Sequence, residues 1–389
     1  MRIALLTNDN REIQRKYHLD EPVFGPAPEA LLEGFKLLDD EVEVHVVSCL
    51  QQMPRRSPKK LANNIFYHPL HVPKIGWLRT GYQGCIRATR RAIHGLQPDI
   101  VHGQGTERDC AMCAVFSGLP NILTIHGVMR AIYQVNKSRP FSYYWFAKHL
   151  ETVAVRRTRG VIAISPYVQG LASRMNRTTW LIPNALRLPF FRPSPPTGRR
   201  PGPPRLINVG TISSNKRQLE LLQHLKPLRD SFEFDVTFVG KSDENNIYSR
   251  DFASLLQTLN ARYGSFLHYE HRTPAQIAEM LDDSDAMLHF SLEESFGLIF
   301  AEALVRNLSL FASDVGAIRQ IGEGIPNCNI ISSNNFTGLV NSVRSWLVHA
   351  EYKTPRASTP SQIVYSRYFP EIIATQHLEV YRQIAPPTY

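Results

Sequence analysis

The sequence predicts two doubly wound α/β domains joined by a proline-rich linker. Short apolar stretches rich in β-branched residues alternate with helical stretches along nearly the whole chain of 389 residues. This alternation is typical of parallel sheets that are covered by helices on both faces. A proline-rich stretch interrupts it at residues 187–204, "RLPFFRPSPPTGRRPGPP". The length also suits two domains, since one domain commonly holds about 100 to 200 residues.

The first domain is predicted to span residues 1–186. Seven β-rich stretches alternate there with helical sequence, at 2–8, 41–48, 63–70, 99–103, 121–127, 160–165 and 179–184. Their nearly continuous apolar character predicts strands that are buried on both faces.

The linker at 187–204 should form neither a helix nor a central strand, because proline lacks the backbone N–H that both structures use. A second alternation follows over 205–365, with strands expected at 205–210, 232–240, 265–270, 285–290, 308–314 and 328–332. Helices are expected from about Asn215, from about Ser249 and from Pro274. Open parallel sheets bind ligands at the carboxyl ends of their strands. We therefore expect the functional site in a cleft between the two domains.

The excess of basic residues lies in the first half of the chain. Of the formal net charge of +10, residues 1–190 contribute 25 Lys and Arg against 14 Asp and Glu. Such a basic domain suits anionic lipid, a phosphorylated acceptor or nucleic acid, or is only a soluble basic surface. Nucleic acid ranks low, because no basic stretch is interleaved with aromatic residues. We expect a cytoplasmic protein that associates with membranes at most peripherally, since no apolar run reaches about 18 residues.

The cysteines do not suggest a disulfide framework. There are five, an odd number, and they are scattered along the chain. Cys110 and Cys113 form a C-x-x-C, but no second pair stands at zinc-ligand spacing. We therefore interpret them as small residues on one helix face.

The stretch "ESFGLIFAE" at 294–302 follows a predicted strand and opens a helix after Gly297. A strand, a glycine turn and a helix N-terminus together form an anion site. Glu302 would lie in that helix and could accept hydrogen bonds from a ribose diol, while Glu294 would lie near the group attached to a diphosphate. The alternative is that Glu294 is a solvated loop residue and Glu302 a surface helix residue.

A second strand, glycine and helix junction lies at "INVGTISSNKRQ", which contains Gly210. We predict that Lys216 and Arg217 begin the helix, where cations oppose the helix dipole unless an anion is bound. Lys216 is therefore a candidate ligand of a leaving phosphate. The alternative is a solvated Lys–Arg pair.

The stretch "HGQGTERD" at 102–109 places several polar residues after a predicted strand. His102, Gln104 and Glu107 could line an acceptor site. Alternatively the stretch caps the next helix, with Thr106 as N-cap and Asp109 at the third helical position. We favour capping.

These motifs, in this order, make the chain resemble the retaining family-4 glycosyltransferases of the GT-B fold, in which two Rossmann-like domains face each other across a cleft. "ESFGLIFAE" is similar to the E-x7-E motif of the family, and "VGTISSNK", "LTIHG", "ISPYV" and "IPNAL" also fit. The resemblance covers nearly the whole chain. It implies that residues 366–389 form a helix that packs back towards the first domain.

The resemblance also implies residue roles. Glu302 would bind the ribose and Glu294 the transferred sugar, with Lys216 and Arg217 on the diphosphate and His126 on the donor sugar. His126, Lys216 and Glu294 would be catalytic. The other residues expected around the donor are Gly210, Thr211, Ser295, Phe296, Gly297 and Leu298.

The implied reaction moves a hexose-type sugar from a UDP-, GDP- or ADP-sugar to a glycan, lipid-linked or small-molecule acceptor. No cofactor or metal is expected, since cations and helix N-termini can neutralise the diphosphate. Asp283 and Asp285 form a D-x-D, but they stand where a helix end leads into a strand, so we regard the pattern as incidental.

The chain departs from the family pattern at three places. Thr211 stands where many members carry Arg, and Gln320 stands where an acid is common. The first loop offers only Gly25 in place of the usual Gly-Gly near the acceptor and the donor phosphates. A second hypothesis is therefore a catalytically impaired GT-B protein that acts as a basic lipid-binding or scaffold module.

Overall fold

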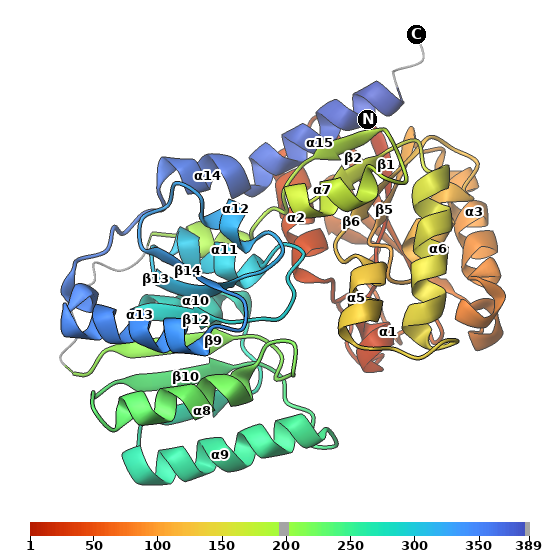
Figure 1. The fold of residues 1–389 in the computed structure, drawn as a ribbon. Coiled ribbons are helices and arrows are strands. Elements are labelled where there is room, and N and C mark those ends of the chain that lie inside the picture. The colour runs from red at the N-terminus through yellow and green to blue at the C-terminus, as the bar shows by residue number, and fades with distance from the viewer. Residues whose placement is uncertain (194–201, 386–389) are drawn as a thin grey trace. The chain divides into compact units, whose positions relative to one another are not determined.

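A computed structural model of the chain describes residues 1–193 and 202–385 (Figure 1). The chain forms two compact units. The first combines Met1–Arg187 with the chain from Arg367 onward, and the second is Leu188–Ser366. The predicted linker at 187–204 lies partly outside the described residues. Its beginning forms a short 3₁₀ helix, η3 (Leu188–Phe191), where we expected no helix of any kind.

The first unit is built on an eight-stranded sheet in the order β3-β4-β2-β1-β5-β6-β7-β8. All neighbouring strands are parallel except β3 and β4. The strands are β1 (Arg2–Leu6), β2 (Glu43–Leu50), β3 (Lys60–Ala62), β4 (Ile65–His71), β5 (Ile100–Gln104), β6 (Asn121–Ile125), β7 (Val161–Ala163) and β8 (Thr179–Leu181). The seven predicted strands are confirmed, and the short edge strand β3 was not predicted.

Helices cover both faces of this sheet because successive strand residues point to opposite sides. On one face, apolar residues of the central strands pack with α2 (Pro26–Leu37) and α15 (Pro370–Ile384). On the other face they pack with α3 (Gln83–Leu96), α4 (Asp109–Val115) and α6 (Tyr143–Arg157). The remaining helices are α1 (Asn10–Gln14), α5 (Met129–Val135), α7 (Pro166–Ala172), η1 (Lys74–Gly76) and η2 (Leu78–Thr80).

The C-terminal helix α15 belongs to the first unit and begins at Pro370 rather than at residue 366. It follows α14 (Gln362–Tyr368), which contains the boundary between the units. A side chain at Gly34 of α2 would place its Cβ atom 2.2 Å from the Pro370 carbonyl oxygen. Glycine at this position therefore lets the backbones of α2 and α15 touch.

The second unit contains a fully parallel six-stranded sheet in the order β11-β10-β9-β12-β13-β14. The strands are β9 (Arg205–Val209), β10 (Asp235–Val239), β11 (Phe266–Tyr269), β12 (Ala286–His289), β13 (Ser309–Asp314) and β14 (Cys328–Ser332). All six predicted strands are confirmed.

One face of this sheet packs with α8 (Gln218–Arg229), α9 (Ile247–Tyr263) and α13 (Phe336–Val348). The helices α11 (Leu298–Val305) and α12 (Ile318–Gly322) contact β12, β13 and β14. The unit also contains α10 (Pro274–Asp282) and η4 (Glu351–Lys353). None of the described helices of either unit is long and apolar enough to span a membrane.

Each sheet has one position at which the strand order reverses. In the second unit it lies between β9 and β12, and in the first between β1 and β5. At such a point the loops leave neighbouring strands in opposite directions and open a crevice at the carboxyl ends. In the second unit, the loop after β9 leads to Lys216 and the loop after β12 leads to Glu294.

Candidate active site

Two loops meet at the strand-order reversal of the second unit. The backbone N–H of Leu292 donates to the Asn215 carbonyl oxygen at 2.8 Å, and the Asn215 side-chain amide donates to the Glu293 carbonyl oxygen at 3.4 Å. Buried Gln218 braces the first loop by donating to the carbonyl oxygens of Gly210 and Thr211. The two motifs that the sequence placed 78 residues apart therefore form one structure.

The ammonium group of Lys216 and the carboxylate of Glu294 form an ion pair and a hydrogen bond in this structure. Nε2 of His289 lies 3.0 Å from the same carboxylate oxygen, Oε1 of Glu294. Burial by itself would raise the pKa of Glu294, but the Lys216 cation and His289 outweigh it and lower the pKa to about 2. Glu294 is therefore ionised at neutral pH, and its side chain is only 12% exposed.

The loop after β13 fixes the backbone of Glu294. Gly316 has a φ of +53°, and a Cβ atom there would lie 1.5 Å from the Glu294 carbonyl oxygen. The backbone N–H of Ala317 donates to this same oxygen at 3.3 Å. Only glycine permits so close an approach, so Gly316 is a positioning residue for Glu294.

The helix α11 follows directly, with Gly297 as its N-cap in the left-handed conformation. Ser295 and Phe296 are buried, and Leu298 is half-buried. Glu302 lies in α11 and is 2% exposed. The alternative interpretations of a solvated loop residue for Glu294 and a surface helix residue for Glu302 are therefore wrong.

Lys216 and Arg217 precede their helix rather than beginning it, which corrects the sequence-based expectation. Arg217 is the N-cap of α8 and adopts a left-handed backbone with φ of +59°. Its guanidinium lies 4.3 Å from the ring centroid of Phe336 and donates to Asn334 at 2.8 Å. Arg217 is thus buried and held by the protein, whereas the Lys216 side chain is 25% exposed.

Lys216 is accordingly the residue of this pair that a ligand can reach. Gly210 is half-buried and Thr211 is exposed at the start of the loop. Gln320 lies exposed on α12. The aspartates of the D-x-D lie at the end of α10 and before β12, where Asp285 accepts a hydrogen bond from the Arg205 backbone at 2.8 Å.

In the first unit, His126 follows β6 at the carboxyl edge of the sheet. Its Nε2 atom lies 2.7 Å from Oε1 of Gln104. Burial, together with the nearby His377, lowers the pKa of His126 to about 4, so the imidazole is neutral at neutral pH. No hydrogen bond with good geometry reaches Nδ1 of His126 within residues 1–193 and 202–385, although Asn184 lies near it.

His102 does not lie at an edge of the first unit, where the sequence suggested an acceptor site. It is fully buried in β5, with Nδ1 hydrogen-bonded to Tyr381 of α15 and Nε2 lying 2.7 Å from Oγ1 of Thr124. Gln104 is also buried and contacts both His102 and His126. The two residues therefore support His126 from inside the unit.

The expectation that Thr106 caps the following helix is wrong. The N-cap of α4 is Arg108, and Asp109 is the first helical residue. Thr106 instead donates to Glu151 at 2.6 Å. Glu107 is half-buried beside the Gly127 backbone, and burial, reinforced by Glu151, raises its pKa to about 7. Within 102–109, Glu107 and Arg108 are half-buried and the other residues are buried.

The first loop is organised by a buried ion pair that the sequence did not reveal. Arg11 and Asp9 pair at 2.7 Å with both side chains fully buried, and the Tyr67 hydroxyl donates to Asp9 at 2.6 Å. Arg11 also donates to the carbonyl oxygens of Leu19 and Asp20. The loop then enters α2 with Gly25 as N-cap in an extended conformation. These bonds fix the conformation of the first loop.

Comparisons with known proteins give the family of the chain. Residues 35–188 match the family model described as "Glycosyltransferase Family 4", and residues 193–356 match that described as "Glycosyl transferases group 1". The chain belongs to the family-4 glycosyltransferases of the GT-B fold.

Curated relatives are distant in sequence. The chain is 22% identical over 296 residues to the alpha-maltose-1-phosphate synthase of Mycobacterium tuberculosis, which covers 70% of this chain and 75% of the relative. It is 23% identical over 184 residues to the N-acetyl-alpha-D-glucosaminyl L-malate synthase of Bacillus anthracis, covering 46% of this chain and 45% of that protein. The match therefore spans less than half of the second relative.

Solved structures match over nearly the full chain. The sucrose-phosphate synthase from Thermosynechococcus elongatus superposes with a TM-score of 0.76 at 18% identity, covering 98% of each chain. HepE of Anabaena, solved in complex with UDP-glucose, superposes with a TM-score of 0.71 at 14% identity, covering 98% of this chain and 100% of that one. At such low identities these matches define the fold.

Proposed function

We propose that the protein transfers a hexose-type sugar from a nucleoside diphosphate sugar to an acceptor with retention of the anomeric configuration. The observation that carries this proposal is the Lys216–Glu294 pair at the strand-order reversal of the second unit. It provides a cation for a diphosphate and an ionised carboxylate beside it, on loops at the carboxyl ends of β9 and β12. That the solved relative HepE is in complex with UDP-glucose supports a nucleotide sugar as donor.

Lys216 stabilises the leaving diphosphate in this proposal. Its ammonium group has three N–H donors, so it can hold Glu294 and a phosphate oxygen at the same time. The backbone N–H groups at the start of α11 add a second source of positive potential. Because these groups are held in place before the sugar departs, they stabilise the negative charge with little reorganisation. No metal is needed in this scheme.

Glu294 and Glu302 hold the two sugars of the donor. Glu302, buried in α11, accepts hydrogen bonds from the ribose diol, and ionised Glu294 faces the transferred sugar, where positive charge develops at the anomeric carbon. Neutral His126 binds a hydroxyl of the same sugar from the first unit. The acceptor attacks from the face that the diphosphate leaves, and a leaving phosphate oxygen takes the acceptor proton.

The acceptor belongs to the glycan, lipid-linked or small-molecule classes, and we place a lipid-linked acceptor first. The connection between α5 and α6 in the first unit carries Phe141, which is 74% exposed, beside exposed Lys137 and Arg139. Tyr143 and Phe146 follow with about two fifths of their surfaces exposed. Apolar side chains next to cations suit peripheral binding to an anionic membrane.

The test has two stages. In a thermal-shift panel of UDP-, GDP- and ADP-sugars, one class of donor should raise Tm, because a ligand that binds only the folded state stabilises it. Proton NMR of the product formed from that donor in excess EDTA should then show the anomeric configuration of the donor. An inverted product would refute retention. Binding of a donor without any transfer or hydrolysis would instead favour the impaired scaffold module. The exposed Thr211 supports that alternative, because it is uncharged where many family members carry Arg.

A further inference from the structure

Four of the five cysteines gather in the core of the first unit. Cys49 lies near the end of β2, Cys85 lies on α3, and Cys110 and Cys113 lie on α4. All four are at most 7% exposed. The fifth, Cys328, lies on β14 of the second unit. These four cysteines therefore come from three elements, β2, α3 and α4.

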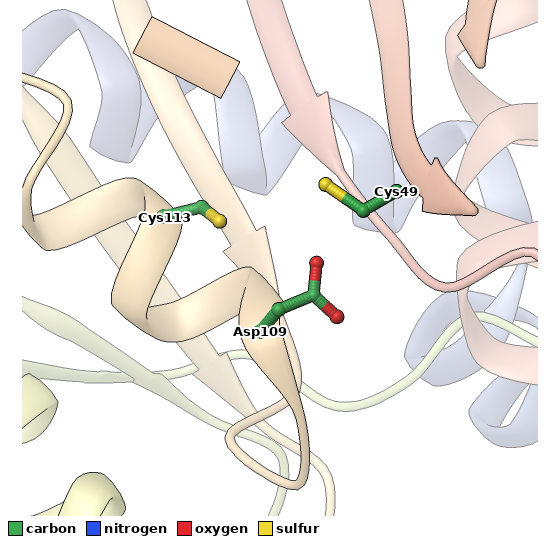
Figure 2. Close-up of side chains that lie close together, drawn as sticks. All are labelled: Cys49, Asp109 and Cys113. Atoms are coloured by element: carbon green, nitrogen blue, oxygen red, sulfur yellow. The ribbon is translucent and has the colours of Figure 1, made fainter. Parts of the chain in front are cut away.

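A buried carboxylate completes this cluster. Asp109, the first residue of α4, is 4% exposed. Figure 2 shows its side chain and those of Cys49 and Cys113 pointing toward one another from β2 and α4. The Sγ atoms of the two cysteines and a carboxylate oxygen of Asp109 all lie within 4.8 Å of one another.

The neighbours of Cys49 add another sulfur. The Cys49 thiol interacts with Cys85 as well as with Cys113 and Asp109, and its Sγ atom lies 3.8 Å from Oγ1 of Thr89. Among the described residues Asp109 forms no ion pair at 4.0 Å or less, although Arg108 precedes it. A carboxylate buried among apolar side chains is costly unless a proton or a cation neutralises it.

We propose that Cys49, Cys113 and Asp109 bind a divalent transition-metal ion of the Zn²⁺ class, with Cys85 as the fourth donor. Thiolate sulfur favours zinc over magnesium or calcium, and closed sites of four protein ligands are typical of structural zinc. Ligand atoms about 2.3 Å from a tetrahedral ion lie about 3.8 Å apart. The ligand atoms of Cys49, Cys113 and Asp109, which lie within 4.8 Å of one another, need only a small contraction of side chains.

Binding is a ligand exchange without oxidation or reduction. Each coordinating thiol loses its proton to solvent as its sulfur bonds to the metal, and Asp109 binds as the carboxylate. Three thiolates and one carboxylate around a 2+ ion leave two negative charges, which the neighbouring Arg108 partly compensates. The ion would tie the end of β2 to α3 and α4. Its role is therefore structural, and it is separate from the Lys216–Glu294 pair of the second unit.

The C-x-x-C motif does not predict this metal site, because its two cysteines are not the two that lie together in the structure. In sequence, Cys113 pairs with Cys110, and that pair lacks a partner pair at zinc spacing. In the structure Cys113 meets Cys49 instead, which lies 64 residues earlier (113 − 49). Under this proposal, Cys110 is still a small helix residue, whereas Cys113 is a metal ligand.

The experiment uses the full chain, purified without a metal-affinity tag and kept reduced. We expect the metal-free protein to bind one Co²⁺ per chain, with the intense near-ultraviolet absorption of sulfur-to-cobalt charge transfer and the visible bands of tetrahedral cobalt. Zn²⁺ should displace the cobalt and raise Tm. Cys113→Ser and Asp109→Asn should weaken metal binding at least tenfold, while the matched controls Cys110→Ser and Cys328→Ser bind as the wild type does.

Three results would overturn the proposal. The first is a reduced wild-type chain that binds no stoichiometric Co²⁺ or Zn²⁺, a measurement that does not depend on how any variant folds. The second is unchanged binding by a folded Cys113→Ser chain, with folding checked by circular dichroism. The third is a Cys49–Cys113 disulfide in the native protein, detected by mass spectrometry. A Tm that EDTA lowers, and that Zn²⁺ but not Mg²⁺ restores, would support the proposal, because a structural metal site stabilises the fold.

Discussion

Lys216 donates a hydrogen bond to Glu294 across the point at which the strand order of the second sheet reverses. Glu294 is in turn held by its backbone carbonyl, which accepts from Ala317 beside Gly316. Three loops, after β9, β12 and β13, thus determine the position of one carboxylate. Such a carboxylate can act on a substrate without first being ordered, which is the main requirement of electrostatic catalysis.

Lys216→Ala should reduce kcat on the order of 100-fold, because it removes a positioned cation next to the developing diphosphate charge. The fold should be retained, since the Lys216 side chain is a quarter exposed. Lys226→Ala, on an exposed position of α8, is the matched control and should keep the wild-type rate. Initial-rate kinetics measure both variants. A near-normal rate for Lys216→Ala would show that this ion pair serves only the structure.

Glu294→Gln and Glu302→Gln should differ in which kinetic constant changes. Glu294→Gln should mainly lower kcat, on the order of 100-fold, because a charge beside the anomeric carbon matters most in the transition state. Glu302→Gln should mainly raise the KM for the donor, about tenfold, because an amide accepts fewer hydrogen bonds from a diol. Steady-state kinetics with varied donor separate the two effects. Equal effects on both constants in both variants would contradict the assigned roles.

Acid should destabilise the first unit through His377, whose pKa burial lowers to about 4. Below about pH 6.5 the unfolded chain binds a proton on this side chain that the folded chain does not bind, so stability falls as the pH falls towards 4. At pH 4 this side chain lowers the free energy of unfolding by about 3 kcal/mol relative to neutral pH. Buried acids such as Glu107, whose pKa is raised, make the folded chain more stable as the pH falls. They therefore mask the effect of His377 on the total free energy of unfolding.

The difference between wild type and His377→Gln reports on His377 together with its electrostatic coupling to His102 and His126. Any destabilisation caused by this substitution should shrink by about 3 kcal/mol between pH 7 and pH 4, because only the wild type loses the histidine contribution. Urea unfolding at several pH values measures it. A difference that stays constant with pH would mean that His377 titrates normally in the folded chain.

The first unit should bind anionic vesicles at low salt. Lys137, Arg139 and the exposed Phe141 provide charge and apolar surface on one connection. Salt should weaken the binding, since exposed charges are screened within about 10 Å at 0.1 M. Phe141→Ser should reduce flotation with the vesicles, whereas Ile247→Ser, which alters an exposed apolar residue of the second unit, should not. Equal flotation with neutral and anionic lipid would refute an electrostatic contribution.

The fold was largely predictable because its signals are local. Each strand of the second sheet is a short apolar run, and Thr273 before Pro274 begins α10 with a capping box that can be read from the sequence. The edge strand β3 was not predicted, because "KLA" is short and partly exposed. Likewise, the start of α8 was placed early because the left-handed backbone of Arg217 is stabilised by Asn334 and Phe336, which come much later in the chain.

The motifs predicted which residues belong to the site but not how these residues contact one another. Lys216 and Glu294 were recognised separately, but their contact and the approach of His289 depend on the order of strands in the sheet. His102 was misplaced for the same reason. A polar residue at the end of a strand suggests an exposed edge. The residue that hydrogen-bonds to His102, Tyr381 of α15, lies far away in the sequence and could not be predicted from it.

The docking of α15 on α2 means that the first unit is assembled from both ends of the described chain. During synthesis, the apolar face formed by Phe35 and its neighbours on α2 has no cover until residues 370–384 leave the ribosome. The second unit can complete its own core before then. Nascent chains interrupted after Ser366 would thus carry a finished second unit and an unfinished first one, whose bare apolar face is a natural target for chaperones.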